Sequence, residues 1–407
     1  MTTLVLLLSL AQELPPAELE KGIDKAIKSG VEWVKKQQKP DGSFGDSSGP
    51  TYGPGQAYHN KPGNTALCLL ALLKSDVDPA DIVVTRGFKF IQEYMKQDGN
   101  LRSTYDRGMS LMAFEGLYEA QVNAKLKKEG KPVTERAGDF REPRYTLTFG
   151  DASFAGVLVK ELAAEQTKAG GWRYGTGFGV VGSEEDVSAT QIVLLGLKSA
   201  TRMKVGVNSA IFQKAMTFVL DSQEKDGPVI DRPSDQEYKP GDRGTYASLG
   251  RDRARGWAYE LKSDKKDETT VTGSMTCAGI AELLICKSVL GKSLTRAQNE
   301  RAETAIYDGF AWLYRNWTVA NNPQSTRSHL YFLYGLERVG TLGCYEKVGK
   351  HKWFQQGAQV LIRAQKSDGS WTDEEVPPKE LYASCFALLF LKRGTVPIGD
   401  VMTGDRK

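Results

Sequence analysis

The sequence predicts an all-α fold, an (α/α)6 toroid in which six outer helices surround six inner ones. Two observations predict it. A short phrase recurs along the 407 residues: a glutamine, a glycine four positions later and an aromatic residue two further on, as in Gln365, Gly369 and Trp371. Each copy lies between a helix with one apolar face and a helix that is apolar nearly all round. Repeated helical hairpins of this kind are typical of closed or stacked repeat architectures.

The phrase divides the chain into six units. Its glutamine position corresponds to residues 38, 95, 166, 223, 317 and 365, with methionine and tryptophan in the second and fifth units. The fourth unit keeps Gly227, and its aromatic is expected at Trp257, displaced by an insertion. The Asp-Gly or similar turn after the glutamine favours a helix end, because glycine adopts the left-handed conformation that terminates helices.

The two helices of each unit differ in pattern. In the first unit Ile23, Ile27, Val31 and Val34 share one face of a helix whose other face carries lysines, which is typical of an outer, half-exposed helix. Residues 67–73 and 386–391 are apolar on every side, which is typical of buried helices. The expected inner helices span residues 64–74, 106–120, 187–200, 272–289, 326–339 and 381–392.

One toroid is expected over residues 21–395, with insertions near 122–149 and 231–270 and a polar tail at 396–407. Residues 1–20 contain a short apolar run without a preceding Lys or Arg, and we expect a signal peptide or a leader there. A cleaved signal would place the protein in the periplasm or outside the cell; otherwise it is cytoplasmic. No later segment is expected to span a membrane, and peripheral membrane contact stays open.

Charge and cysteine usage limit the partners. Lys and Arg number 54 against 50 Asp and Glu, and the net charge of +4 is spread along the chain. No nucleic-acid partner is expected, since that function requires a concentrated basic surface. The five cysteines form no CxxC pair, so neither a disulfide framework nor a zinc knuckle follows. The oligomeric state is not indicated by the sequence.

The recurring phrase resembles the QW repeat of the prenyltransferase and squalene-oxidocyclase superfamily. The resemblance covers nearly the whole chain, and residues 274–279, 333–340 and 385–393 resemble a poorly characterised bacterial group of squalene-cyclase-like proteins. It implies the toroid and an isoprenoid or other apolar ligand in a central cavity. An enzyme of this kind would be a class II terpene-cyclase-like isomerase or lyase. The alternative is a non-catalytic toroid that binds a lipid, a peptide or a protein partner.

The resemblance implies a candidate acid where the third inner helix begins. Asp186 matches the central aspartate of the cyclase acid motif and Glu184 the first acidic position, with Glu185 between them, while Val187 replaces the last acidic residue. A carboxylic acid can protonate a substrate when its surroundings keep it protonated. The alternative is helix capping, because acidic residues stabilise a helix N-terminus.

The cyclase resemblance also implies aromatic side chains around the cavity, because ring faces attract cations. The inner helices offer six candidates for contacts to substrate: Phe114, Tyr118, Tyr331, Tyr334, Tyr382 and Phe386. Ordinary core packing is the alternative, since aromatic residues at helical spacing are common in protein cores.

A zinc site is a second alternative implied by the resemblance to protein prenyltransferases. Cys277 and His329 begin late inner helices, as two of the zinc ligands do in that family, but Met275 stands where an aspartate ligand belongs. Catalytic zinc normally has three protein ligands. We therefore expect no cofactor, with zinc as the alternative.

Overall fold

The computed structural model describes residues 14–45, 61–98, 101–131, 133, 145–174, 185–233, 245–246, 250–260, 269–373 and 379–395. The polar tail expected at 396–407 and most of the expected leader lie outside these residues. Helix α2 begins at Pro16, inside the segment expected to be a leader.

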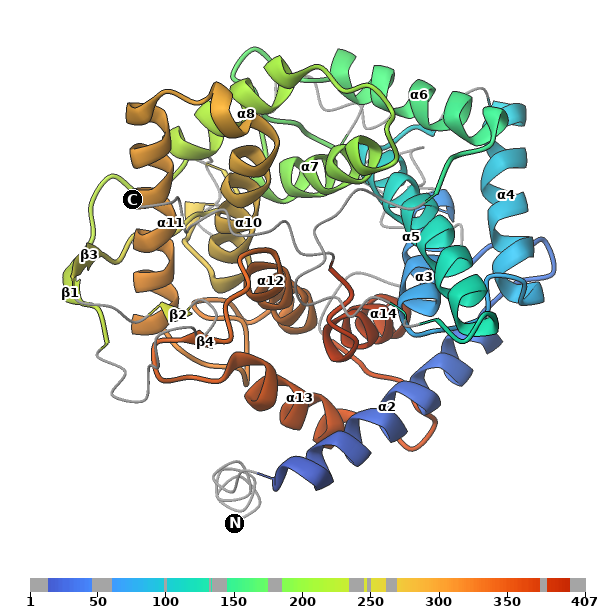
Figure 1. Cartoon of the computed structure of the whole chain (residues 1–407). Helices are drawn as coiled ribbons and strands as arrows, with labels where there is room; N and C mark the ends of the chain where they lie inside the picture. Colours follow the sequence, from blue (N-terminus) through green and yellow to red (C-terminus); the bar gives the residue numbers. More distant parts are fainter. Residues whose placement is uncertain are drawn as a thin grey trace, which may run out of the picture.

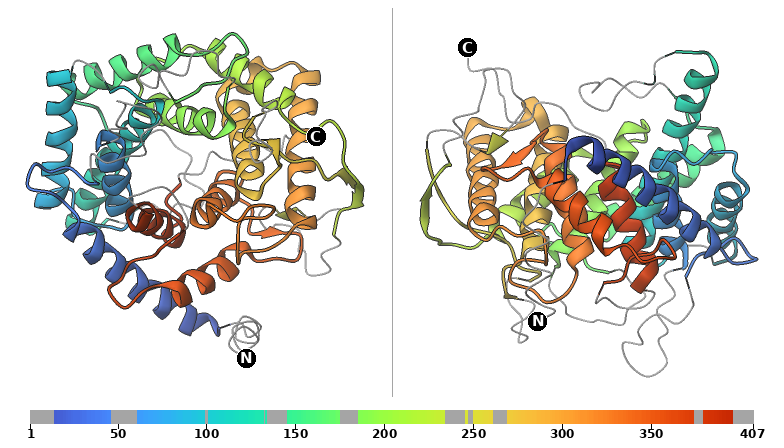
Figure 2. Two further views of the ribbon diagram at one scale, coloured as in Figure 1. Left: turned by 180° about the vertical axis from the view of Figure 1, so that it is seen from behind. Right: turned by 90° about the horizontal axis from the view of Figure 1, so that it is seen from below.

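Twelve α-helices in the described part of the chain form two concentric rings, which confirms the predicted (α/α)6 toroid (Figure 1). The outer ring consists of α2 (Pro16–Lys36), α4 (Ile82–Asp98), α6 (Phe149–Ala164), α8 (Ser209–Asp221), α11 (Arg296–Arg315) and α13 (Trp353–Ala364). The inner ring consists of α3 (Lys61–Lys74), α5 (Thr104–Lys128), α7 (Val187–Arg202), α10 (Gly273–Leu290), α12 (His329–Leu342) and α14 (Lys379–Leu391). The ring is also visible from behind, and the view from below shows the toroid edge-on (Figure 2).

Each inner helix packs against the next one in sequence, and α14 packs against α3 to close the ring. The sequence pattern explains the two layers. Along α2 the apolar residues Leu19, Ala26, Val31 and Val34 are buried, whereas nearly every residue of α10 is buried. Apolar burial on all sides of the inner helices provides the main stabilisation of the toroid.

In the units that contain it, the repeated glutamine joins one unit to the next outer helix. Nε2 of Gln365 donates to the carbonyl oxygen of Gly369 at 2.9 Å and to that of Ala26, in α2, at 2.8 Å. The same two bonds recur from Gln38 to Gly42 and Val83, and from Gln166 to Gly170 and Ile211. The glutamine side chain therefore connects the turn after its own helix to the backbone of the next outer helix.

The glycine of the phrase is required for two reasons. Gly42, Gly170 and Gly369 have φ angles of 89°, 108° and 95°, in the left-handed region that favours glycine. A Cβ atom at Gly369 would also lie 2.4 Å from the carbonyl oxygen of Ser29 in α2. The glycine lets the turn of one unit approach the outer helix of the next.

The repeat tryptophans lie between the rings. The indole N–H of Trp172 donates to the carbonyl oxygen of Leu162 at 2.7 Å, and that of Trp257 donates to Val219 at 2.8 Å. Trp257 thus makes the contact expected of the fourth unit's aromatic, which confirms that the insertion displaced it.

The expected insertion at 231–270 contributes short strands outside the rings (Figure 1). Strand β1 (Val229–Asp231) pairs antiparallel with β3 (Arg251–Arg253), and β2 (Thr245–Tyr246) pairs parallel with β4 (Lys347–Val348). A 3-10 turn, η1 (Gly291–Ser293), follows α10.

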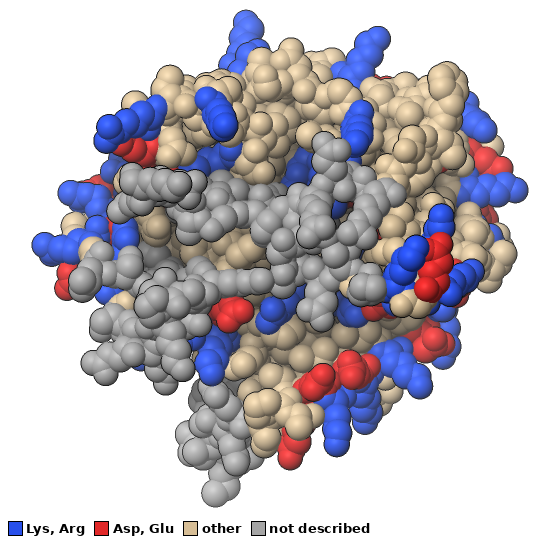
Figure 3. Space-filling model, in the orientation of Figure 1, with Lys and Arg blue, Asp and Glu red and all other residues tan. Residues whose placement is uncertain are grey.

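In the part of the chain that the structure describes, one segment, Gly273–Ser293, is long and apolar enough to span a membrane by length and composition. The most apolar 18-residue stretch of this segment is 89% buried inside the protein, as the inner position of α10 requires. On the face shown in Figure 3, Lys and Arg side chains lie around the rim with Asp and Glu among them.

Candidate active site at the inner-helix N-termini

The centre of the candidate site is Asp186, the N-cap residue of α7. Its Oδ1 accepts a hydrogen bond from the backbone N–H of Ala189 at 2.8 Å, and its Oδ2 accepts one from the hydroxyl of Tyr174 at 3.0 Å. The backbone N–H of Asp186 donates to the carbonyl oxygen of Trp172 at 3.0 Å, which ties the helix start to the repeat tryptophan. The capping interaction expected as an alternative is present, and the same carboxyl has a second partner.

Burial changes the acidity of this carboxyl. The side chain is 3% exposed, and removal from water raises the pKa of Asp186 from 3.8 to about 6. The bond from Ala189, the charge of Arg173 and the bond from Tyr174 oppose the rise in pKa, and the negative charge of Glu260 adds to it. Asp186 therefore keeps its proton to a higher pH than an exposed aspartate does.

A second carboxylate lies beside Asp186. Glu260 is buried and forms an ion pair with Arg173, and both residues influence the pKa of Asp186 electrostatically. The Arg173 guanidinium also lies over the Tyr174 ring, 5.4 Å from its centroid. Arg173 thereby connects the hydroxyl partner of Asp186 with the second carboxylate.

Hydroxyl groups extend from this site toward the centre of the ring. The Tyr105 hydroxyl lies 2.6 Å from Oγ of Ser188, which lies 3.0 Å from the Tyr331 hydroxyl. Tyr331 donates to Oε1 of Gln191 at 3.0 Å, so Ser188 donates to Tyr331 and Tyr105 donates to Ser188. The Tyr105 ring stacks on Tyr174 with centroids 5.7 Å apart. The chain of hydroxyls thus begins next to Asp186.

Polar side chains also lie inside the inner ring, next to these hydroxyls. Arg338 donates to Oε1 of Gln191 at 2.7 Å and lies over the Tyr334 ring at 4.1 Å. Glu282 is completely buried with neither carboxylate oxygen hydrogen-bonded, and burial raises its pKa well above the usual range. An interior with a guanidinium, an amide and a carboxyl differs from the apolar cavity that an isoprenoid requires.

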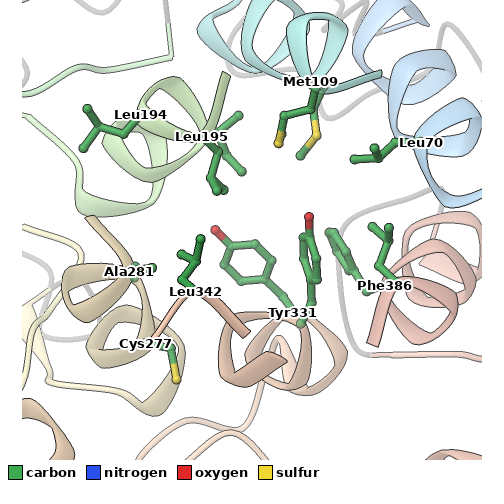
Figure 4. Close-up of a cluster of buried hydrophobic side chains, with 14 of the residues drawn as sticks. Leu70, Met109, Leu194, Leu195, Cys277, Ala281, Tyr331, Leu342 and Phe386 are labelled. Atoms are coloured by element: carbon green, nitrogen blue, oxygen red, sulfur yellow. The ribbon is translucent and has the colours of Figure 1, made fainter. Parts of the chain in front are cut away.

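Three of the six predicted aromatic residues meet near the ring centre. The Phe386 ring lies 5.4 Å from both Tyr331 and Tyr334. In Figure 4, Tyr331 and Phe386 face Met109 and Leu195 from opposite inner helices. The three aromatic side chains, Met109 and Leu195 are all buried, so they fill much of the space at the centre of the inner ring.

Phe114 and Tyr118 of α5 lie elsewhere. The Phe114 ring packs on Phe88 of α4 at 5.0 Å and on Phe154 of α6 at 4.9 Å. The Tyr118 hydroxyl donates to Oδ2 of Asp151 at 2.6 Å, at the start of α6. Both side chains therefore fill the space between the rings, as in the core-packing alternative, because they point toward the outer helices.

The other predicted residues have separate surroundings. Tyr382 donates to Oδ1 of Asn64 at 2.7 Å, where α14 meets α3. Glu185 is half-buried beside Gly171, and Glu184 lies outside the described residues.

Cys277 and His329 have separate partners. Cys277 is buried against Gly335, and Nε2 of His329 lies 2.9 Å from the carbonyl oxygen of Val319. Burial raises the pKa of the Cys277 thiol and lowers the pKa of His329. Within the described ranges, no group of three or more His, Cys, Asp or Glu residues is placed to hold a metal ion.

The positions of Tyr174, Arg173 and Glu260 next to Asp186 were not predicted from the sequence. A signal was present, since both Trp172 and Trp257 are followed two positions later by a tyrosine. The structure brings the two segments together at Asp186: Tyr174 donates to its carboxyl, and the carbonyl oxygen of Tyr259 accepts the N–H of Val187 at 3.1 Å.

The fold and the site define a protein of the (α/α)6 toroid class with a carboxyl-containing site at the inner-helix N-termini. No family model matches the sequence, and no curated protein matches it. Similar solved structures include the α-1,6-mannanase of glycoside hydrolase family 76 from Salegentibacter sp. HEL1_6 (TM-score 0.52, 8% identity, covering 91% of this chain and 98% of that one). An inactive variant of that enzyme in complex with α-1,6-mannotriose (TM-score 0.51, 8% identity, with the same coverage) is also similar. A third is a family 76 glycoside hydrolase from a bovine Bacteroides thetaiotaomicron strain (TM-score 0.52, 8% identity, covering 91% and 77%).

These findings correct the functional expectation. The similar structures are glycoside hydrolases, which contradicts a terpene-cyclase-like function together with its lipid-, peptide- or protein-binding and zinc-dependent alternatives. The resemblance to the squalene-cyclase superfamily is supported only as far as the shared toroid class. The repeat phrase did not predict the function because its residues end helices and connect units, and one such scaffold can carry active sites for different reactions.

Proposed function

We propose that this protein is a glycoside hydrolase whose catalytic carboxyl groups are Asp186 and Glu260. The observation that supports the proposal most directly is the pairing of a buried aspartate, whose pKa is raised to about 6, with a second carboxylate held by Arg173. Glycoside hydrolysis requires two carboxyl groups with different protonation states.

In this proposal Asp186 is the general acid. Its proton passes to the glycosidic oxygen as the bond to the anomeric carbon breaks, so the leaving sugar departs as an alcohol. Glu260, with its charge balanced by Arg173, either removes a proton from the attacking water or attacks the anomeric carbon itself. The first route inverts the anomeric configuration. In the second route the sugar is left bonded to Glu260, and water, deprotonated by the Asp186 carboxylate, then attacks the anomeric carbon and releases Glu260, so that two displacements retain the configuration. NMR of the first product distinguishes the two routes.

The proposed substrate is an oligosaccharide. Supporting features are the hydroxyls of Tyr105, Ser188 and Tyr331, which offer hydrogen-bonding partners for sugar hydroxyls, and the stacked rings of Tyr105 and Tyr174. Two of the similar structures are of one α-1,6-mannanase, the second an inactive variant in complex with α-1,6-mannotriose, so an α-mannan is the first substrate to test.

The test measures release of reducing sugar from α-1,6-mannotriose and from a panel of other α- and β-linked oligosaccharides. We expect Asp186→Asn and Glu260→Gln each to lower turnover by roughly 10²–10⁴-fold. Glu300→Gln, on the outer face of α11 and paired with Arg296, is the matched control and should retain full activity. Absence of hydrolysis across the panel, or full activity in Asp186→Asn, would overturn the proposal.

A further inference from the structure

A pair of cysteines faces each other where the ring closes. Cys68 in α3 and Cys385 in α14 are both completely buried, with Sγ atoms 3.6 Å apart. They belong to the first and last inner helices and are separated by 317 positions in sequence. Every other pair of neighbouring units is consecutive in the sequence and is joined directly by the chain, whereas the first and last units meet only through non-covalent contacts.

The two helices are parallel and their register is defined by contacts on both sides of the cysteines. The contacts that define it are Tyr382 to Asn64 at 2.7 Å, Cys385 to Cys68 at 3.6 Å and Lys392 to Asp76 at 2.6 Å. The spacing between these residues is nearly the same in the two segments. Cys68 lies four residues after Asn64 and eight before Asp76, and Cys385 lies three after Tyr382 and seven before Lys392. The sulfur atoms therefore face each other because the whole helix pair is aligned.

The outer ring closes at the same boundary. Gln365 binds the carbonyl oxygen of Ala26, and the Trp371 ring lies so close to Gly30 that a Cβ atom there would be 2.7 Å away. The boundary between the last and first units is thus built from both layers, with the cysteine pair on its inner side.

We propose that Cys68 and Cys385 form a disulfide that covalently closes the ring when the protein meets a small disulfide oxidant such as glutathione disulfide. One thiolate attacks the oxidant and releases a glutathione thiolate, leaving a mixed disulfide. The second cysteine thiolate attacks the protein sulfur of that mixed disulfide and releases the second glutathione. Two protein thiols are oxidised, one glutathione disulfide is reduced, and the protons pass to the two glutathiones.

Burial determines when this exchange takes place. Neither sulfur is exposed in the closed ring, and burial raises the pKa of Cys68, so the thiols react only while the boundary is open. Oxidation therefore accompanies folding or transient opening of α14 from α3. Once formed, a cross-link over a loop of this length restricts the unfolded chain strongly.

The experiment refolds the full chain with reduced and oxidised glutathione and analyses it by non-reducing peptide mapping. We expect one cross-linked peptide pair containing Cys68 and Cys385, two hydrogens lighter than the reduced pair. The unfolding temperature should rise by roughly 5 °C relative to the reduced protein.

Two kinds of variant make the test specific. Cys68→Ser and Cys385→Ser should show neither the cross-link nor the increase in unfolding temperature on oxidation. Cys277→Ser, at an equally buried cysteine in α10, should show both. Since the wild type is compared with itself in two redox states, a folding defect in one variant does not obscure the result. A refolded wild type without this cross-link, or with Cys68 joined to another cysteine, would overturn the proposal.

Discussion

The hydroxyl of Tyr174 donates a 3.0 Å hydrogen bond to Oδ2 of Asp186, so a residue two positions after a repeat tryptophan orients the carboxyl that begins the next inner helix. The repeat and the candidate site are connected through this bond. Structural residues of the repeat thereby determine where the polar groups of the site lie.

Replacing Tyr174 by Phe should raise the pKa of Asp186, because the hydrogen bond stabilises the ionised carboxylate. Since a general acid is active while protonated, activity should persist to higher pH, with the alkaline limb shifted by about one pH unit. The measurement is the pH profile of kcat/KM. Tyr105→Phe removes a hydroxyl bonded to Ser188 and serves as the control; an equal shift in that variant would argue against a direct effect of Tyr174.

Asp106 should make the protein less stable as the pH rises. Burial raises its pKa from 3.8 to about 7, although the N–H groups of Gly63 and Ser103 donate to its carboxylate. The native state then holds a proton that the unfolded chain releases above pH 4. This contribution to the free energy of unfolding is complete below pH 4 and is lost as the pH rises through 7, and it amounts to about 4 kcal/mol.

Urea unfolding at pH 4 and pH 7.5 measures this effect. Asp106→Asn cannot ionise, so its free energy of unfolding should decline less than that of the wild type between the two pH values. Equal declines in the two proteins would show that Asp106 is not the titrating group.

Gln365→Ala should destabilise the closed ring. The substitution removes bonds to the carbonyl oxygens of Ala26 and Gly369, each worth about 1 kcal/mol, and we expect a loss of roughly 2 kcal/mol in the free energy of unfolding. Gln166→Ala removes the equivalent pair between consecutive units and is the matched comparison. No loss of stability in either variant would mean that water replaces these bonds without cost.

Two glycines in inner helices should respond in opposite directions to alanine. A Cβ atom at Gly279 would lie 2.3 Å from the Trp257 indole, so Gly279→Ala should cost roughly 1–3 kcal/mol through the clash. A Cβ atom at Gly116 would meet Leu70 at 3.4 Å, an ordinary contact. Gly116→Ala should therefore stabilise the protein by up to about 1 kcal/mol through helix propensity. Thermal unfolding compares them, and destabilisation of both by the same amount would contradict the steric explanation.

The fold was predictable because helix pattern and turn chemistry are local. The amphipathic face of α2, the all-round apolar sequence of α10 and the left-handed glycines can each be read within a few residues. The repeat added the long-range information, since equivalent positions in the six units imply equivalent contacts between units.

The site was predictable only in part. Asp186 could be identified because acidic residues precede an inner helix, but Glu260 reaches it from a distant insertion. Whether Phe114 points to the centre or to the outer ring depends on how α5 is rotated about its own axis. A helix that is apolar on all sides gives no indication of that rotation. The repeat indicated no chemistry, because its glutamine, glycine and tryptophan residues end helices and connect neighbouring units.

The bond from Gln365 to Ala26 has a consequence for how the protein tolerates truncation. Open repeat arrays end in capping units with a polar outer face, whereas the first and last units here cover each other. The faces of α3 and α14 can remain apolar because neither is ever the end of an array. Removing one hairpin would expose two apolar edges at once, so a five-unit fragment should aggregate instead of persisting as a shortened monomer.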